Sequence, residues 1–168
     1  MRADIVALAR GWLGTPYHHQ ASLKGVGCDC LGLIRGVYAE ACGRPAEAPP
    51  AYSRDWAEAS ARETMIEAAG RHMTRIDPGT VEPGDVLIFR LRPGAMAKHC
   101  AIVTEHPGPT SGPAAVRMAG GQLKFIHAIE GAAACEVHLT PWWRRRVAAA
   151  YRFPDQEDSH AEQPVQHP

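Results

Sequence analysis

Cys30 is the residue of this sequence best placed to act as a nucleophile. It stands at the start of a predicted helix, directly after Asp29, which is a typical N-cap residue. Unpaired backbone N–H groups and the helix dipole favour a negative charge there. A cationic neighbour can lower the pKa of such a thiol to roughly 3.5–7.5. The sequence therefore predicts a reactive thiolate at Cys30 if a histidine lies beside it.

Two histidines in predicted strands could be its partners. His99 opens a strand-like run at residues 99–104, and alternation along a strand places its side chain opposite that of Cys100. We therefore expect that His99 and Cys100 do not both face one cleft. His127 lies in another strand-like run and could orient the first imidazole. A nucleophile, a base and an orienting group on three elements follow the general logic of a catalytic triad.

The elements that must position these residues change along the chain. Apolar residues at helical spacing predict helices at residues 2–13, 30–41 and 54–73. Short β-type runs bounded by Gly or Pro then predict strands at 86–89, 99–104, 116–119, 122–129, 136–139 and 147–153. Helices followed by strands are typical of an α+β domain with a mostly antiparallel sheet. We expect one domain at residues 1–153 and a disordered, polar tail at 154–168.

Composition and charge argue against several classes of partner. The 18 basic and 18 acidic residues balance, so the positive field that nucleic-acid binding needs is lacking. No run approaches the roughly 18–20 apolar residues that span a bilayer, and residues 1–10 do not form a secretory signal. Five cysteines at irregular spacings argue against a disulfide framework. We expect no nucleic-acid or membrane partner and at least one free thiol.

Three other features each allow two interpretations. His18 and His19 with Cys28 and Cys30 could bind zinc, but Cys-x-Cys is not the usual spacing and no metal site is predicted. Cys28 precedes the helix, which favours a packing role over redox modulation of Cys30. The basic and aromatic residues 142–146 could bind a polyanion or a sugar ring, yet a short charge run is usually solvated surface, which we prefer.

Five segments together resemble the NlpC/P60 cysteine peptidases in order and spacing. They are WLGTPY at 12–17, DCLGL at 29–33, PGDVL at 83–87, HCAIV at 99–103 and IHA at 126–128. The resemblance covers nearly all of the chain up to Phe153. Residues 17–30 are most similar to the subgroup encoded with tail genes of phages and of gene transfer agents. The family commonly has serine after the nucleophile, where this chain has Leu31.

This resemblance implies a papain-like α+β fold and a role for each site residue. Cys30 would be the nucleophile, His99 the general base and then acid, and His127 the third polar member. Tyr17 would help to hold the developing oxyanion. The implied reaction of this thiol protease is hydrolysis of the bond between γ-D-glutamate and a diamino acid, typically meso-diaminopimelate, in peptidoglycan stem peptides. It implies no metal and no organic cofactor.

The nearer resemblance also implies a place of action. An enzyme made in the cytoplasm without a signal peptide could reach periplasmic peptidoglycan as a component of a phage or gene transfer agent tail, in contact with tail or baseplate proteins. Two other functions remain open. One is a non-catalytic tail or hub connector that retains the fold, since fold does not determine function. The other is an amidase or acyltransferase that uses the same Cys/His pair.

Overall fold

The computed structural model describes residues 2–49, 62–106 and 123–155 of the 168-residue chain. The strand expected at 116–119, the first part of the helix expected at 54–73 and most of the tail expected at 154–168 lie outside these residues. No helix in the described part of the chain is both long and apolar enough to span a membrane.

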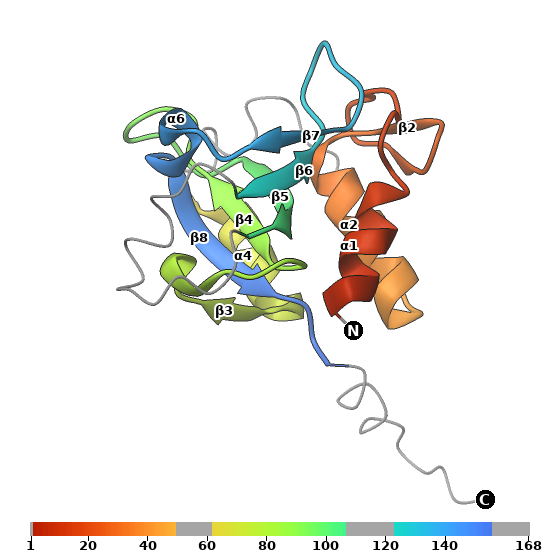
Figure 1. Cartoon of the computed structure of the whole chain (residues 1–168), viewed down its shortest axis with the longest axis horizontal. Helices are drawn as coiled ribbons and strands as arrows, with labels where there is room; N and C mark the ends of the chain where they lie inside the picture. Colours follow the sequence, from red (N-terminus) through yellow and green to blue (C-terminus); the bar gives the residue numbers. More distant parts are fainter. Residues whose placement is uncertain (1, 50–61, 107–122, 156–168) are drawn as a thin grey trace, which may run out of the picture.

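Two N-terminal helices pack side by side against one face of the sheet (Figure 1). α1 (Arg2–Arg10) is shorter than predicted, because turns occupy residues 11–14. α2 (Cys30–Cys42) begins at the predicted residue and ends one residue later, where Gly43 adopts a left-handed φ of 66°. α2 and the turn after α1 approach closely at Gly36, since a Cβ there would lie 2.0 Å from the ring of Trp12.

A six-stranded antiparallel sheet forms the second layer, with the strand order β3-β8-β4-β5-β6-β7. β4 (Val86–Phe89) and β5 (His99–Glu105) lie near its middle, and they correspond to the strands predicted at 86–89 and 99–104. The other strands are β3 (Thr74–Ile76), β6 (Lys124–His127), β7 (Cys135–His138) and β8 (Val147–Arg152). The predicted α+β class with a mostly antiparallel sheet is confirmed.

Several short elements complete the described chain. β1 (Ser22–Leu23) and β2 (Gly27–Cys28) form a small hairpin before α2. α4 (Thr64–His72) packs near β8, the second strand of the sheet, and leads into the edge strand β3. η1 (Pro78–Thr80) follows β3, and α6 (Pro141–Arg144) precedes β8. The sequence did not predict β3, because three residues at a sheet edge are too few to show a period-2 pattern.

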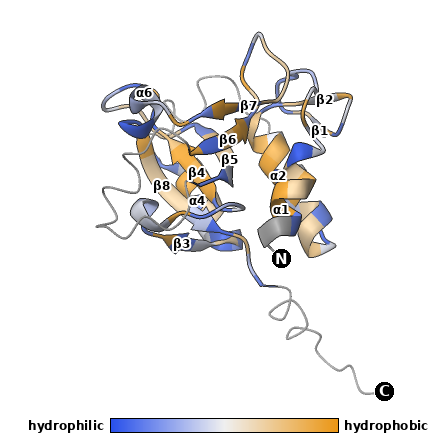
Figure 2. Ribbon diagram, viewed as in Figure 1, coloured by the Kyte–Doolittle hydropathy of each residue, from blue (hydrophilic) through white to orange (hydrophobic). Residues whose placement is uncertain are grey.

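Apolar side chains cover both faces of the central strands. All four residues of β4 are buried, and their side chains alternate between two clusters. One cluster joins Val86 and Ile88 to α1, α2 and α4, and the other joins Leu87 and Phe89 to Phe125 and Trp143. Figure 2 shows α2 and β4 as mainly hydrophobic. Burial on both faces holds the central strands rigidly, and β5 can therefore present its first residue at a defined position.

Candidate active site

The first turn of α2 is held in place by the loop before it. The Asp29 carboxylate accepts hydrogen bonds from the backbone N–H groups of Gly32 (2.7 Å) and Gln20 (2.8 Å). Ala21 lies so close to this turn that a Cβ on Gly32 would be 1.8 Å from its carbonyl oxygen. The predicted N-cap at Asp29 is confirmed, and Cys30 is thereby fixed as the first residue of the helix.

Cys30 meets the sheet at the beginning of β5. Its Sγ lies 3.9 Å from the carbonyl oxygen of Lys98, the residue before that strand. The thiol is half-buried and packs against the aliphatic cluster around α2. His99, the first residue of β5, interacts with it both as a charge and as a hydrogen-bond partner. The structure thus brings together the predicted nucleophile and the predicted base.

The two predicted histidines also meet, from neighbouring strands. Nε2 of His99 lies 2.9 Å from Nδ1 of His127, and both side chains are buried. Burial, and then the charge of His99, lower the pKa of His127 to about 4. A neutral His127 can accept a hydrogen bond at Nδ1 from the Nε2–H of His99. This leaves Nδ1 of His99 for the interaction with Cys30.

The pKa of Cys30 is held well below its ordinary value. The main cause is a hydrogen bond from the thiol of Cys100, followed by the positive charge of His99 and a hydrogen bond with it. Burial and the charge of Asp29 act in the opposite direction. The same contact raises the pKa of Cys100, which therefore stays a thiol and donates. Cys30 is the thiolate of the pair because it alone stands beside His99 at a helix N-terminus.

The side chains of His99 and Cys100 lie on opposite faces of β5, as predicted. His99 stacks on Trp143, while Cys100 belongs to the aliphatic cluster and lines the cavity described below. Both nevertheless interact with Cys30. The reason is that Cys30 sits at the end of the strand, where a large sulfur atom can contact side chains from both faces.

Tyr17 lies next to the segment that precedes the nucleophile. Its backbone forms a parallel bridge with Cys28, and the N–H of Cys28 donates to the carbonyl of Pro16 (3.0 Å). Its side chain packs against the aliphatic cluster to which Cys30 also belongs. The structure therefore places Tyr17 in the neighbourhood of Cys30, and the role of its hydroxyl at an oxyanion stays a prediction.

Trp143 is a member of the site that the sequence did not predict. Its half-buried ring stacks on His99 with a centroid distance of 5.4 Å and an interplanar angle of 28°. It also meets His127 edge-on at 5.3 Å. The interpretation of residues 142–146 as solvated surface is wrong for this residue, although Trp142 is 44% exposed and lies under the guanidinium of Arg146. The available sequence signal was Pro141, which is typical of the first position of a helix and indicates that a following hydrophobic residue can face the core.

The residues considered for zinc binding have other surroundings. Cys28 is fully buried, and burial, Asp29 and Cys30 raise its pKa to about 11, so its thiol stays protonated. Nδ1 of His19 lies 3.8 Å from the Asp29 carboxylate, and the ring of His18 packs on Gly27. In the described ranges, no three His, Cys, Asp or Glu side chains are grouped to hold a metal ion. All five cysteines are free thiols.

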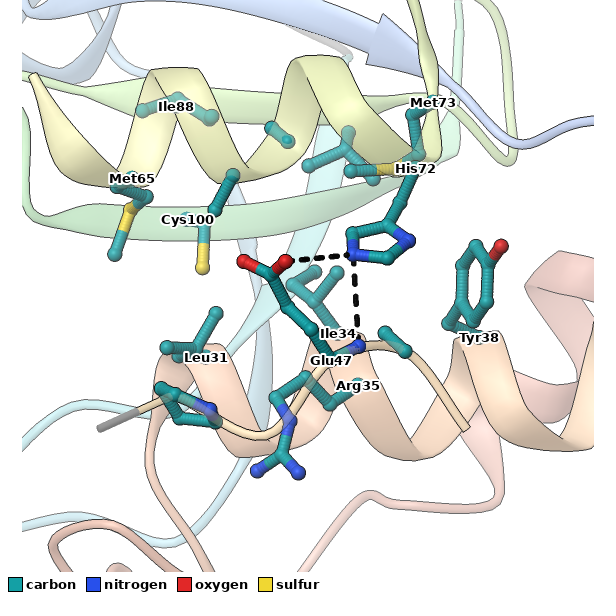
Figure 3. Close-up of a pocket in the computed structure, with 15 residues that line it drawn as sticks. Leu31, Ile34, Arg35, Tyr38, Glu47, Met65, His72, Met73, Ile88 and Cys100 are labelled. Carbon is teal, nitrogen blue, oxygen red and sulfur yellow. Dashed lines mark hydrogen bonds and ion pairs between the residues drawn. The ribbon is translucent and has the colours of Figure 1, made fainter. Parts of the chain in front are cut away.

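An apolar cavity of about 70 Å³ lies behind the nucleophile, between α2, α4 and residues 46–49. Figure 3 shows Leu31 and Ile34 of α2 on one side and Met65 and Met73 on the other, with Cys100 reaching into the space between. Glu47 and His72 form an ion pair on its wall (Figure 3). Cys100 thus links this cavity to Cys30, while the histidine pair lies on the opposite face of the sheet.

Comparisons with known proteins concern the family and the fold of the chain. A model of the NlpC/P60 family matches residues 14–152. A search of curated proteins gives no match. Among solved structures, the NlpC/p60 domain of peptidoglycan hydrolase SagA has 23% identity and a TM-score of 0.59, over 91% of this chain and 99% of that domain.

Two longer proteins show the same fold. An NlpC/P60 family protein from Bacillus cereus has 20% identity and a TM-score of 0.58, over 91% of this chain and 40% of its own. An NLP/P60 family protein similar to a lipoprotein, from Staphylococcus aureus, has 19% identity and a TM-score of 0.57, over 90% of this chain and 41% of its own. The chain spans about two fifths of both. Because the family model covers most of its length, the chain belongs to the NlpC/P60 family.

Proposed function

We propose that this protein is a cysteine endopeptidase that cleaves the bond between γ-D-glutamate and a diamino acid, typically meso-diaminopimelate, in peptidoglycan stem peptides. The observation that carries the proposal is the convergence of Cys30, His99 and His127 from three elements. Family membership supports the thiol chemistry, and the neighbouring structure described as a peptidoglycan hydrolase supports the substrate class.

The reaction follows from the order of the three groups. The Cys30 thiolate attacks the amide carbonyl carbon, and His99 gives its proton to the nitrogen as the C–N bond breaks. Water then attacks the thioester while His99 accepts its proton, and the carboxylic acid leaves as the thiolate is restored. His127 stays neutral and holds the ring of His99 in position through Nε2. Tyr17 would donate to the developing oxyanion, a contribution of roughly 10²–10³ in rate for one donor.

The site of action is a second part of the proposal. We infer that the protein acts from a phage-like or gene transfer agent tail, bound to tail or baseplate proteins, because residues 17–30 resemble that subgroup. Mass spectrometry of purified particles from producing cells checks this: the chain should copurify with the tail proteins. Its presence in the soluble fraction alone, with particles that lack it, would contradict the inference.

Defined muropeptides incubated with the purified protein test the chemistry. We expect mass spectrometry to find the peptide released with a free amino group on the diamino acid, and no release by the Cys30→Ala variant. Cys42→Ala is the matched control, since Cys42 is a half-buried free thiol at the far end of α2, and it should cleave like the unaltered protein. Release of the whole stem from muramic acid would instead identify an amidase, and no cleavage by a folded protein would favour the connector.

A further inference from the structure

Trp143 contacts both members of the histidine pair. Its ring meets five others, those of His99, His127, Phe89, Phe125 and Trp142, at centroid distances of 4.8–5.4 Å. Only the contact with His99 is stacked, at 28°, while the other four are edge-to-face. The indole thus lies with its flat face toward the imidazole that would carry positive charge in the reaction.

We infer that Trp143 is a positioning residue of the active site, which shields the His99–His127 hydrogen bond from water and stabilises the imidazolium form of His99 through its ring face. This inference rests on the proposed function and names a residue that acts through His99 without touching the substrate.

The first physical reason is the attraction between a cation and an aromatic face. A cation within about 6 Å of an indole centroid is stabilised, and more so where water is excluded. His99 is buried and lies 5.4 Å from the centroid of Trp143. A stabilised imidazolium favours the thiolate–imidazolium pair over the neutral thiol and imidazole, so the reactive form of Cys30 extends over a wider range of pH.

The second reason is the exclusion of water from His127. This histidine must stay neutral to accept the Nε2–H of His99, and burial is what keeps it so. Trp143 meets His127 edge-on and Phe125 lies against it as well. Removal of the indole would expose the pair to water, and a protonated His127 could no longer accept a hydrogen bond from His99.

Among the described residues that face His99, Trp143 can be substituted without the removal of a titratable group. The titratable groups that face His99 are Cys30 from α2 and His127 from β6, and Asp29 and Cys100 act on it through Cys30. β4 and α6 contribute the rings of Phe89 and Trp143, which do not titrate. The guanidinium of Arg146 is directed to Trp142 and to backbone carbonyls.

The test is the pH dependence of alkylation of Cys30, followed by mass spectrometry of the peptide that contains it. This measurement needs no substrate, so it decides the role of Trp143 even if no stem peptide is cut. We expect Trp143→Leu to slow labelling by about three- to tenfold on the acid side of the profile.

Two further variants separate this role from a structural one. Trp143→Phe keeps an aromatic face of weaker attraction and should shift the profile in the same direction by less, which matters if the leucine variant fails to fold. Trp142→Leu removes the exposed ring that meets Trp143 edge-on at 4.8 Å, keeps the face of Trp143 on His99, and should leave the profile unchanged. If folded Trp143→Leu and Trp143→Phe proteins label with the unaltered profile and differ only in melting temperature, Trp143 is a packing residue and the inference is overturned.

Discussion

Both faces of the central sheet are packed largely with aliphatic side chains, but the histidine pair and the rings around it lie on one face alone. The face under α1, α2 and α4 is mainly aliphatic, and it includes Leu33, Ile88 and Ile102. The opposite face carries a group of rings, Phe89, Phe125 and Trp143, around the histidine pair. On the aliphatic face, α2 carries Cys30 at its first residue. The aromatic face carries His99 and His127. The site lies at the first residue of β5, where Cys30 meets His99.

This division has a physical reason. Aliphatic packing fixes the distance between a helix and a sheet, but it offers nothing that distinguishes protonation states. Rings offer a face that attracts positive charge and an edge that excludes water. We therefore expect substitutions on the aliphatic face to change stability without changing its dependence on pH, and substitutions at the histidine pair to change that dependence.

Leu33→Ala should produce the largest loss of stability. Leu33 is fully buried between α2 and the sheet, and truncation of a buried leucine costs about 2–5 kcal/mol in free energy of unfolding. Urea denaturation at pH 7 and at pH 5 should show the same loss at both values, because no titrating group is affected. Leu23→Ala, at a 60% exposed position, is the control and should change little. A loss of stability that differs between the two pH values would contradict the expectation that substitutions on the aliphatic face do not change the pH dependence of stability.

His127→Asn should remove part of the sensitivity to acid. Folded His127 takes up a proton only near pH 4, whereas a histidine in the unfolded chain does so near pH 6.5. Between these values the unfolded state binds more protons, so the free energy of unfolding falls as the pH drops, by about 3 kcal/mol in total. Asparagine does not titrate, yet its side-chain oxygen can still accept a hydrogen bond from His99.

The measurement is urea denaturation of both proteins from pH 7 to pH 4. The unaltered protein should lose stability over this range, and the variant should lose less by roughly the amount given by the shift of His127. Equal slopes for the two proteins would show that His127 is not kept neutral in the folded state. Its proposed role as an acceptor for His99 would then fail as well.

The sequence predicted the aliphatic half of this architecture better than the aromatic half. The helical spacing in α2, the N-cap at Asp29 and the β-type runs at 86–89 and 99–104 are local signals, and each corresponds to an element of the structure, with β5 one residue longer than predicted. Trp143 and Cys100 were missed because their roles depend on partners far along the chain. Alternation along β5 correctly separated Cys100 from His99 by face, yet it could not show that one sulfur atom at the strand end contacts both.

Cys100→Ala tests the contact between Cys100 and Cys30, where the two faces of the sheet meet. Of the substitutions discussed, we expect it to have the smallest effect, a modest change in the alkylation rate of Cys30. The thiol of Cys100 is the main cause of the low pKa of Cys30, with His99 second. Its removal should raise the pKa of Cys30 and slow alkylation at pH values below the plateau by roughly three- to tenfold, as for one modest hydrogen bond. Cys100→Ser, which keeps a donor, should restore most of the rate, whereas Cys42→Ala should not change it. Unaltered labelling of the alanine variant would mean that His99 and the helix N-terminus hold the thiolate by themselves, and the aliphatic face would then supply only position to the chemistry.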